Sequence, residues 1–211
     1  MSRQSTEDNG RGFYAEHGKR ALDLALSLPL LALLAPPMCV IALLVKRSGP
    51  GPVLFTQERM GRNGSAFRLY KFRTMTESAG GGPQVTSAGD PRVTRTGRVL
   101  RKYKLDELPQ ILNVIKGDMS LVGPRPEVRK YADAYKEEYS SILRVSPGIT
   151  DYAALRFRNE EEILARYPDA EDAYTRVILP EKITLYKKYI NEMGLIADLK
   201  ILFRTVLEVI R

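Results

Sequence analysis

Two adjacent carboxylates, Asp106 and Glu107, directly follow a strongly basic stretch of the sequence that includes Arg101 and Lys104. Nearby cations keep a carboxylate ionised. An ionised aspartate can attack phosphorus as a nucleophile, and it is also a hard ligand for Mg²⁺, which usually arrives with substrate phosphates. The pattern therefore indicates a site that handles phosphate groups. The alternative is that the two acids only cap a helix.

A third charged residue, Arg125, stands between two prolines in the sequence "GPRP". Each proline fixes its own φ angle and restricts the residue before it, so the backbone that carries Arg125 is stiff. A guanidinium presented rigidly can bind phosphate or carboxylate through two hydrogen bonds. A rigid turn whose arginine pairs with a surface acid is the alternative. The acid pair, the basic run and Arg125 together favour a phosphate site.

Two predicted elements would position these side chains. Pro109 is compatible with the first turn of a helix that "QILNVI" continues, which places the acids near a helix N-terminus. Upstream, "VLFT" and "FRLYKF" are prone to form strands, and "GRNG" supplies the turn of a hairpin. In the second strand Lys71 and Arg73 share a face with Phe67 and Leu69. These two cations either reach a bound anion or form a solvated strand end.

The composition narrows the chemistry further. The chain has 211 residues, a formal net charge of +8, one histidine and one cysteine. The charge suggests an anionic partner, such as nucleic acid, anionic lipid or a phosphate-bearing substrate. A single cysteine excludes an internal disulfide and a cysteine-rich zinc site. Because the single histidine lies in a polar N-terminal tail, proton transfer and nucleophilic attack fall to carboxylates.

An uncharged segment, residues 24–45, is long enough to cross a membrane as a helix. Basic residues flank it at both ends, and such residues prefer the cytoplasmic side. Pro36 and Pro37 lie just past its middle, where prolines kink or break a helix. We therefore expect either a re-entrant helix over residues 19–47, which turns at these prolines and leaves on the same face, or an ordinary kinked spanning helix.

The C-terminal residues "LIADLKILFRTVLEVIR" have an amphipathic helical pattern. Such a helix can lie in the membrane interface or pack on the rest of the protein, and the pattern leaves both possibilities open. Its polar stripe consists of Lys200, Arg204, Glu208 and Arg211.

Several stretches of the chain are typical of one protein family. They are "KRALDLALSLPLLALLAPP", "FTQERMGRNGSAFRLYKFRTM", "DPRVTRTGRVLRKYKLDELPQILNVIKGDMSLVGPRPE" and "SPGIT". Together they resemble the bacterial sugar transferases called monotopic phosphoglycosyl transferases. The resemblance runs from about Lys19 to Thr150 and returns only loosely near "LIADLKIL". The block around "LDELPQ" and "GPRP" is its most specific part.

The resemblance implies transfer of a sugar 1-phosphate from a UDP-sugar to a polyprenol phosphate such as undecaprenyl phosphate. The products would be a polyprenyl-diphospho-sugar and UMP, and the step would initiate synthesis of a glycoconjugate such as exopolysaccharide, O-antigen, capsule or glycoprotein. Asp106 would be the nucleophile, through a covalent phosphosugar intermediate, and a ligand of the expected cofactor Mg²⁺. Glu107 would help with proton transfer or metal binding. The positions that match phosphate-handling residues are Lys71, Arg73, Arg101 and Arg125.

For the fold, we expect an α+β, mainly helical protein in three parts. A flexible tail, residues 1–18, precedes a re-entrant membrane helix, residues 19–47, broken at Pro36 and Pro37. Residues 48–211 form a cytosolic, membrane-associated catalytic domain with a small β-hairpin and amphipathic interfacial helices. The expected location is the cytoplasmic face of a bacterial inner membrane, with membrane lipids as partners and no nucleic acid. The sequence leaves the oligomeric state open.

Two features depart from the family pattern. Ala35 stands where many members have a serine before the first proline, so the helix break is held in a different way. After "PGIT" the chain continues "DYAALRFRNEEEILARYP" rather than glycine, aromatic residue and glutamine, so the sugar is not predicted.

Rival functions are an ordinary glycosyltransferase, which releases UDP, and a membrane-anchored module that binds anionic lipid or nucleic acid. A binding module of this kind would explain the many basic residues, but it would not need the two acids Asp106 and Glu107 in their midst.

Overall fold

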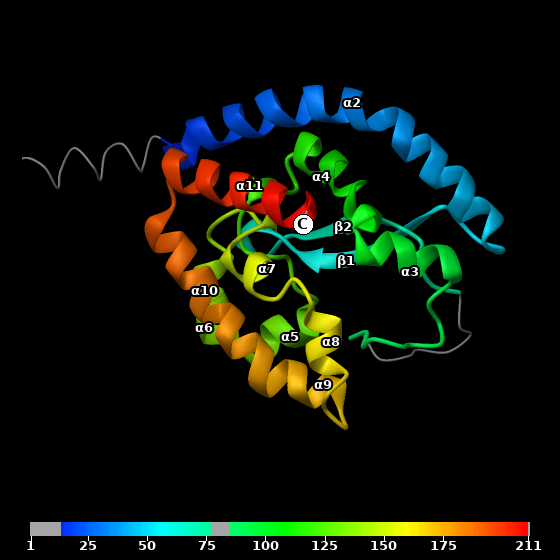
Figure 1. Cartoon of the computed structure of the whole chain (residues 1–211). Coiled ribbons are helices and arrows are strands. Elements are labelled where there is room, and N and C mark those ends of the chain that lie inside the picture. The colour runs from blue at the N-terminus through cyan, green and yellow to red at the C-terminus, as the bar shows by residue number, and fades with distance from the viewer. Residues whose placement is uncertain (1–13, 77–84, 211) are drawn as a thin grey trace, which may run out of the picture.

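The computed structural model of the chain describes residues 14–76 and 85–210, and these residues are mainly helical, as expected. Besides the helices, the described residues form two small pairs of strands, and Figure 1 shows the larger pair near the centre of its view. The main elements, in chain order, are α2 (Lys19–Arg47), β1 (Leu54–Met60), β2 (Ala66–Phe72), α3 (Arg95–Lys102), α4 (Gln110–Lys116), β3 (Ser120–Val122), α5 (Arg129–Ala134), α6 (Lys136–Ile142), β4 (Gly148–Thr150), α7 (Tyr152–Arg156), α8 (Glu160–Leu164), α9 (Ala170–Ala173), α10 (Leu179–Glu192) and α11 (Leu195–Ile210).

The longest helix, α2, carries Pro29, Pro36 and Pro37 inside it. Within the described part of the chain it is the one helix long and apolar enough to cross a membrane, by length and composition. Figure 1 shows it curved over one side of the other elements. The helical backbone continues through the two prolines at which a break was expected. Its re-entrant path through a membrane stays a prediction.

Both ends of α2 contact the rest of the protein. Near its N-terminal end, Asp23 accepts a hydrogen bond of 2.9 Å from the backbone N–H of Leu121. Near its C-terminal end, Val45 is fully buried in a cluster with Phe72 and Leu100. The side chains between these anchors are largely exposed and apolar. The exposed large ones are Leu26, Leu28, Leu30, Leu33, Val40, Leu43 and Leu44.

A buried polar cluster reinforces the N-terminal anchor of α2. Lys19 forms an ion pair of 2.6 Å with Asp198 of α11. The hydroxyls of Tyr14 and Tyr189 donate to the same carboxylate at 2.6 and 2.8 Å. Tyr14 lies in a helical turn, Tyr14–Gly18, within the segment predicted as a tail, and residues 1–13 of that segment lie outside the described residues.

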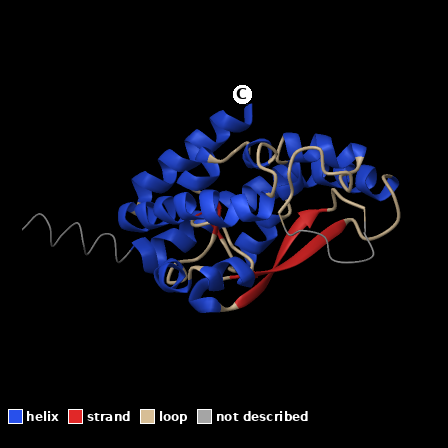
Figure 2. Ribbon diagram, turned by 90° about the horizontal axis from the view of Figure 1, so that it is seen from below, coloured by secondary structure: helices blue, strands red, loops and turns tan. Residues whose placement is uncertain are grey.

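The predicted hairpin is confirmed. Strands β1 and β2 pair antiparallel, with Leu54 opposite Phe72 and Met60 opposite Ala66. The turn between them contains Asn63 at φ 57°, a left-handed conformation that asparagine tolerates better than most residues. Figure 2 shows the hairpin along one edge of the molecule, with the short pair β3–β4 lying among the helices.

The core consists of three clusters of buried side chains. The largest, around α10, includes Tyr131, Tyr174 and Tyr186, while a second packs Leu69 of the hairpin against residues of α4, β3 and α11. The third joins α2, β2 and α3. Each fully buried large apolar side chain stabilises the fold by about 1.5–3 kcal/mol. The three clusters therefore hold the hairpin, α3 and α4 in fixed relative positions.

Helix α11 packs on the body through one side, where Asp198 and Ile201 are each 1% exposed. Packing on the rest of the protein, one of the two expected possibilities, is therefore observed. The opposite side of α11 is apolar and exposed. Contact of the open side with a membrane stays a prediction. The exposed large side chains are Leu195, Ile196, Leu199, Phe203, Val206 and Leu207.

Candidate active site

The acid pair lies in a tight turn between two helices. Residues Leu105–Glu107 form a single 3₁₀ turn, which follows Lys104 in the left-handed conformation at φ 56°. Pro109 is the N-cap of α4, close to the helix start that the sequence predicts. Leu105 and Leu108 pack beside the cluster formed by α2, β2 and α3. The apolar side chains on either side therefore fix the turn and its two carboxylates.

Glu107 is held by two of the predicted phosphate-binding cations. Arg125 forms two hydrogen bonds with it, Nη1 to Oε2 at 3.1 Å and Nη2 to Oε1 at 2.5 Å. Lys71 donates to Oε1 at 3.0 Å from strand β2. Burial alone would raise the pKa of Glu107, but Arg125 and Lys71 outweigh it and hold this pKa well below its usual range. Glu107 is therefore an ionised carboxylate that brings the two cations together.

Asp106 has a different environment from its neighbour. It is 7% exposed, and no group in the described part of the chain donates a hydrogen bond to its carboxylate. Burial and the adjacent Glu107 raise the pKa of Asp106, while Lys71, Arg101 and Lys104 partly offset the rise. Two acids adjacent in sequence thus have unlike roles, since one is neutralised by contact and the other keeps its oxygens available.

The Pro-Arg-Pro segment is positioned by a parallel pairing that the sequence analysis did not predict. Strand β3 leads into it and pairs with β4, which contains the "GIT" of "SPGIT". The N–H of Gly123 donates to Thr150, and the N–H of Gly148 donates to Pro124, both at 2.9 Å. A Cβ on Gly148 would lie 2.1 Å from the nitrogen of Gly123, so this close approach requires glycine. The two family motifs are therefore adjacent, and the pairing fixes the backbone of Arg125.

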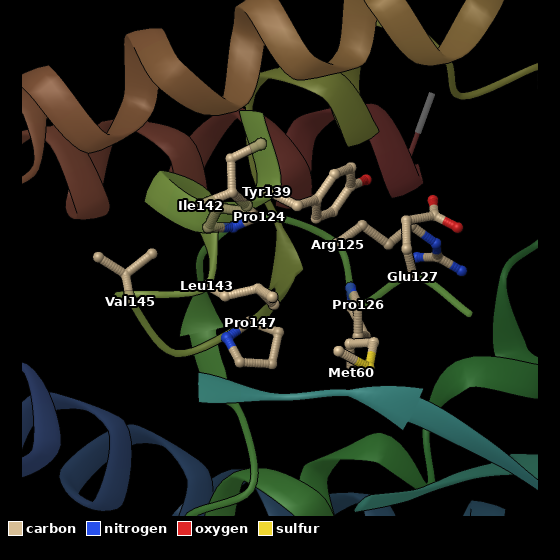
Figure 3. A pocket seen from close by; sticks show the side chains of 10 residues that line it. All are labelled: Met60, Pro124, Arg125, Pro126, Glu127, Tyr139, Ile142, Leu143, Val145 and Pro147. Atoms are coloured by element: carbon tan, nitrogen blue, oxygen red, sulfur yellow. The ribbon is translucent and has the colours of Figure 1, made fainter. Parts of the chain in front are cut away.

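Figure 3 shows the packing behind Arg125. A cavity of about 10 Å³, roughly the size for one water molecule, lies between the Pro-Arg-Pro segment, β1 and α6. Its lining includes Met60, Pro126, Tyr139 and Pro147. The guanidinium of Arg125 points to the side away from Pro147 in this view. The cavity is too small for a substrate, and its apolar walls support the arginine from behind.

Arg101 is near the acid pair but bonds elsewhere. Its guanidinium donates to Glu161 of α8 from Nε at 3.0 Å and from Nη2 at 2.6 Å. Its Nη1 also donates to the hydroxyl of Thr74 at 3.3 Å. Because its charge lowers the pKa of Asp106, Arg101 lies within electrostatic reach of the acid pair.

Arg73 bonds to backbone carbonyls and makes no ion pair with the acid pair in the described residues. It is 6% exposed and donates to three backbone carbonyls, those of Val45 at 3.0 Å, Gly49 at 2.8 Å and Pro50. These carbonyls belong to the end of α2 and to the linker that follows it. In this arrangement Arg73 fastens the C-terminal end of α2 to the end of β2.

Two residues of the site were missed by sequence reasoning. Glu161, the partner of Arg101, lies in an acidic run that carries no local sign of its contact. Asn113 is fully buried and links α4 to the hairpin, because it accepts from the N–H of Tyr70 at 3.1 Å and donates to the carbonyl of Arg68 at 2.8 Å. The sequence could have indicated a buried, hydrogen-bonded role for Asn113, since it is a polar residue inside the apolar run "QILNVI".

The donor atoms of the site suit a metal ion that arrives with its substrate. The described residues contain no group of three or more acidic, histidine or cysteine side chains placed to hold a metal ion. Mg²⁺ is commonly held by one or two carboxylates together with substrate phosphates. The available oxygens of Asp106 fit that requirement, whereas those of Glu107 already contact Arg125 and Lys71.

The geometry defines a class of site: a buried carboxylate that accepts no hydrogen bond from the described residues, with cations nearby, on a body that holds both ends of a long apolar helix. The family model described as "Bacterial sugar transferase" matches residues 14–211. The chain belongs to the bacterial sugar transferase family.

Named relatives agree with this assignment. The chain is 41% identical over 195 residues to the UDP-N-acetylgalactosamine-undecaprenyl-phosphate N-acetylgalactosaminephosphotransferase of Aeromonas hydrophila, covering 89% of this chain and 42% of that protein. It is 42% identical over 194 residues to the UDP-glucose:undecaprenyl-phosphate glucose-1-phosphate transferase of Caulobacter vibrioides, covering 89% and 68%. It is 39% identical to the exopolysaccharide production protein PSS of Rhizobium leguminosarum bv. phaseoli, covering 89% and 92%. The chain thus spans less than half of the first relative.

Proposed function

We propose that this protein transfers a sugar 1-phosphate from a UDP-sugar to undecaprenyl phosphate, releasing UMP and initiating the synthesis of a bacterial glycoconjugate. The names of the Aeromonas and Caulobacter relatives support the reaction class. The Rhizobium relative, which the chain nearly covers, links it to exopolysaccharide production. The relatives act on different sugars, so the sugar of this protein is left open.

One observation carries the proposal: Asp106 is a buried carboxylate without a hydrogen-bond partner in the described residues, beside cations that can receive a diphosphate. A carboxylate stripped of hydrogen bonds is a better nucleophile than one held by donors, because its lone pairs are free. Lys71 and Arg125 are held by Glu107 next to it. A polyanionic donor would find these charges already gathered at the nucleophile.

The proposed reaction has two displacements at one phosphorus atom. In the first, a carboxylate oxygen of Asp106 attacks the phosphorus that carries the sugar, and the bond to the bridging oxygen breaks. UMP leaves with that oxygen, and a phosphosugar remains bound to Asp106. In the second, a phosphate oxygen of the polyprenol phosphate attacks the same phosphorus and frees the carboxylate. The product is the polyprenyl-diphospho-sugar.

Of the two roles expected for Glu107, the charge distribution favours one in which it stays ionised. A general base works best when its pKa lies near the operating pH, and Arg125 and Lys71 hold the pKa of Glu107 far below that range. We infer that Glu107 positions the two cations beside Asp106. It would take up a proton only after a substrate phosphate has drawn Arg125 or Lys71 away.

Mg²⁺ is part of the proposal as a cofactor that arrives with the UDP-sugar. Asp106 is the residue that would hold it. Bound there, the ion would supply positive charge to the diphosphate. Arg125 and Lys71 supply the remaining positive charge from the protein and orient the phosphates relative to Asp106.

The placement of α2 supports a re-entrant path at the cytoplasmic face of the inner membrane. A helix of 29 residues is about 44 Å long, more than the roughly 30 Å of a hydrocarbon core. Asp23 near one end and Val45 near the other both contact the same body. A helix that crossed the membrane could not keep both contacts with a body on one side. Insertion from one face lets the exposed leucines enter the lipid while the two ends stay at the surface.

Separate assays of UMP and UDP test the proposal. Detergent-solubilised protein is given Mg²⁺, undecaprenyl phosphate and a panel of UDP-sugars. Release of UMP with one sugar supports phosphosugar transfer and names the donor. Release of UDP instead contradicts the proposal, because an ordinary glycosyltransferase leaves both phosphates on the nucleotide. Asp106→Asn is the matched control and should release neither nucleotide.

A further inference from the structure

The exposed side of α3 carries a basic surface that the proposed reaction does not yet use. Its side chains follow the i, i+3, i+4, i+7 spacing of one helix face and continue into the turn after the helix. We name this surface the α3 outer face. It consists of Arg95, Arg98, Val99, Lys102, Tyr103 and Lys104, all of them exposed.

The cations of the α3 outer face are not neutralised by the protein. Arg95, Arg98, Lys102 and Lys104 make no ion pair with any residue in the ranges 14–76 and 85–210. The Nζ of Lys102 lies 5.5 Å from the centroid of the Tyr103 ring. Unpaired charges gathered on one face repel each other, which an anion bound across them would relieve.

The buried side of α3 fixes this surface beside the lipid-facing helix. Leu100 is 3% exposed and clusters with Ile41 and Val45 of α2. A Cβ on Gly97 would lie 2.1 Å from the carbonyl oxygen of Thr74, so α3 lies tightly against the backbone after β2. The part of α2 that Leu100 contacts also has exposed apolar residues, Val40, Leu43 and Leu44. Helix α3 therefore packs on the same part of α2 that carries these exposed apolar side chains.

The other end of the α3 outer face reaches the catalytic turn. Lys104 immediately precedes Leu105–Glu107 and is close enough for its charge to lower the pKa of Asp106. Arg101, on the flank of the same helix, contributes in the same direction. The surface thus extends from the lipid-facing helix to the proposed nucleophile.

The chemistry of the surface fits a phosphate monoester on a lipid. Its cations match a dianionic headgroup, while Val99 at 54% and Tyr103 at 50% exposure give apolar contacts that suit a membrane interface. Nucleic acid would use the cations but not the adjoining apolar side chains of α2. We propose that the α3 outer face binds the phosphate of the polyprenol phosphate acceptor and directs it to Asp106. The proposal rests on the proposed function, whose second substrate it locates.

The test separates the two halves of the reaction. Arg98→Gln combined with Lys102→Gln removes two cations of the α3 outer face. Arg166→Gln combined with Lys187→Gln is the matched control, because these residues are also exposed and unpaired within the described chain and the charge change is equal. The full chain is assayed in nanodiscs of neutral lipid, with UMP release measured first without and then with undecaprenyl phosphate.

We expect the α3 variant to release the first equivalent of UMP as the wild type does, with an unchanged KM for the donor. Its KM for undecaprenyl phosphate should rise about tenfold or more, whereas that of the control pair should stay within about twofold. An unchanged acceptor KM, or an equal loss in both pairs, overturns the proposal. An acceptor effect that appears only in discs containing anionic lipid also overturns it, because the surface would then bind the bilayer in general.

A binding measurement keeps this test independent of the proposed reaction. Native mass spectrometry of the detergent-solubilised protein with added undecaprenyl phosphate should show a bound lipid that the α3 variant loses and the control pair keeps. Retention of the lipid by the α3 variant overturns the acceptor site. Failure of the wild type to release UMP from any UDP-sugar contradicts the proposed function instead, so the two failures are distinguishable.

Discussion

Arg125 and Glu107 form a two-bonded ion pair next to Asp106, with Nη1 to Oε2 at 3.1 Å and Nη2 to Oε1 at 2.5 Å. The pair joins the Pro-Arg-Pro segment to the turn that carries both acids. It therefore couples the rigid arginine to the charge state of the site. A change at Arg125 should alter the pKa of Glu107 as well as the binding of phosphate.

Arg125→Ala should lower kcat/KM for the donor about 100-fold, because a bidentate phosphate contact is lost. It should also move the acid limb of the pH profile to higher pH. Arg125 lowers the pKa of Glu107, so its removal raises that pKa, and protonation then begins at a higher pH. The measurement is UMP release between pH 4 and 8. Arg129→Ala, at an exposed position of α5, is the control, and an unmoved acid limb in Arg125→Ala would contradict the coupling.

Arg73→Gln should destabilise the protein rather than weaken donor binding. Its guanidinium donates to one carbonyl of α2 and to two in the linker after it, and loss of these hydrogen bonds should cost about 2–4 kcal/mol of unfolding free energy. Lys71→Gln, two residues earlier in the hairpin, should instead raise the donor KM. Thermal unfolding by circular dichroism and donor KM are measured for both. A raised donor KM with unchanged stability in Arg73→Gln would restore the phosphate role that the sequence predicts.

Asp198→Asn should loosen the N-terminal end of α2. It would leave the buried ammonium of Lys19 without its carboxylate, which typically costs 3–5 kcal/mol of stability, roughly. Limited proteolysis should then cut near the start of α2 sooner than in the wild type. Asp133→Asn, an exposed aspartate on α5, should change neither property. If proteolysis near the start of α2 were equally slow in both variants, the buried cluster would not anchor the helix.

Asp151 should make the protein less stable as the pH rises. Burial raises its pKa to about 7, and its Oδ2 has no partner among the described residues. An aspartate whose folded pKa is raised binds more protons in the folded state, so stability falls between about pH 4 and pH 7. Asp151→Asn keeps a hydrogen-bond acceptor for the Ala154 N–H and removes the fall in stability with rising pH. Its unfolding free energy should exceed that of the wild type by about 4 kcal/mol at pH 8 and nearly match it near pH 4. A constant difference across this range would contradict the assignment.

Much of the site could be predicted because it depends on local chemistry. The acid pair, the stiff arginine and the basic strand end are all recognisable from residue types and spacing. The two-residue period of β2 predicts that Lys71 and Arg73 share a face, and in the structure Lys71 contacts Glu107. Arg73 shares that period but lies beyond the last residue of the strand, Phe72, so its direction is set by the nearby carbonyls of α2.

The rest depends on contacts between distant segments. Strands β3 and β4 have three residues each, too few for a periodic signal, and their pairing was missed. The contact of Arg101 with Glu161 joins residues 60 positions apart. Likewise, both anchors of α2 depend on side chains in later parts of the chain. Local patterns do not encode such pairings, which only the packed structure brings together.

The central claim is that Asp106 carries the phosphosugar. The most direct measurement incubates the protein with Mg²⁺ and its UDP-sugar donor in the absence of undecaprenyl phosphate, followed by acid quenching, peptide mass spectrometry and UMP assay. We predict about one UMP released per protein and a sugar-phosphate adduct on the peptide that contains Asp106, with neither in Asp106→Asn. Later addition of undecaprenyl phosphate should remove the adduct. Full turnover by Asp106→Asn, or an adduct on another residue, would contradict the account.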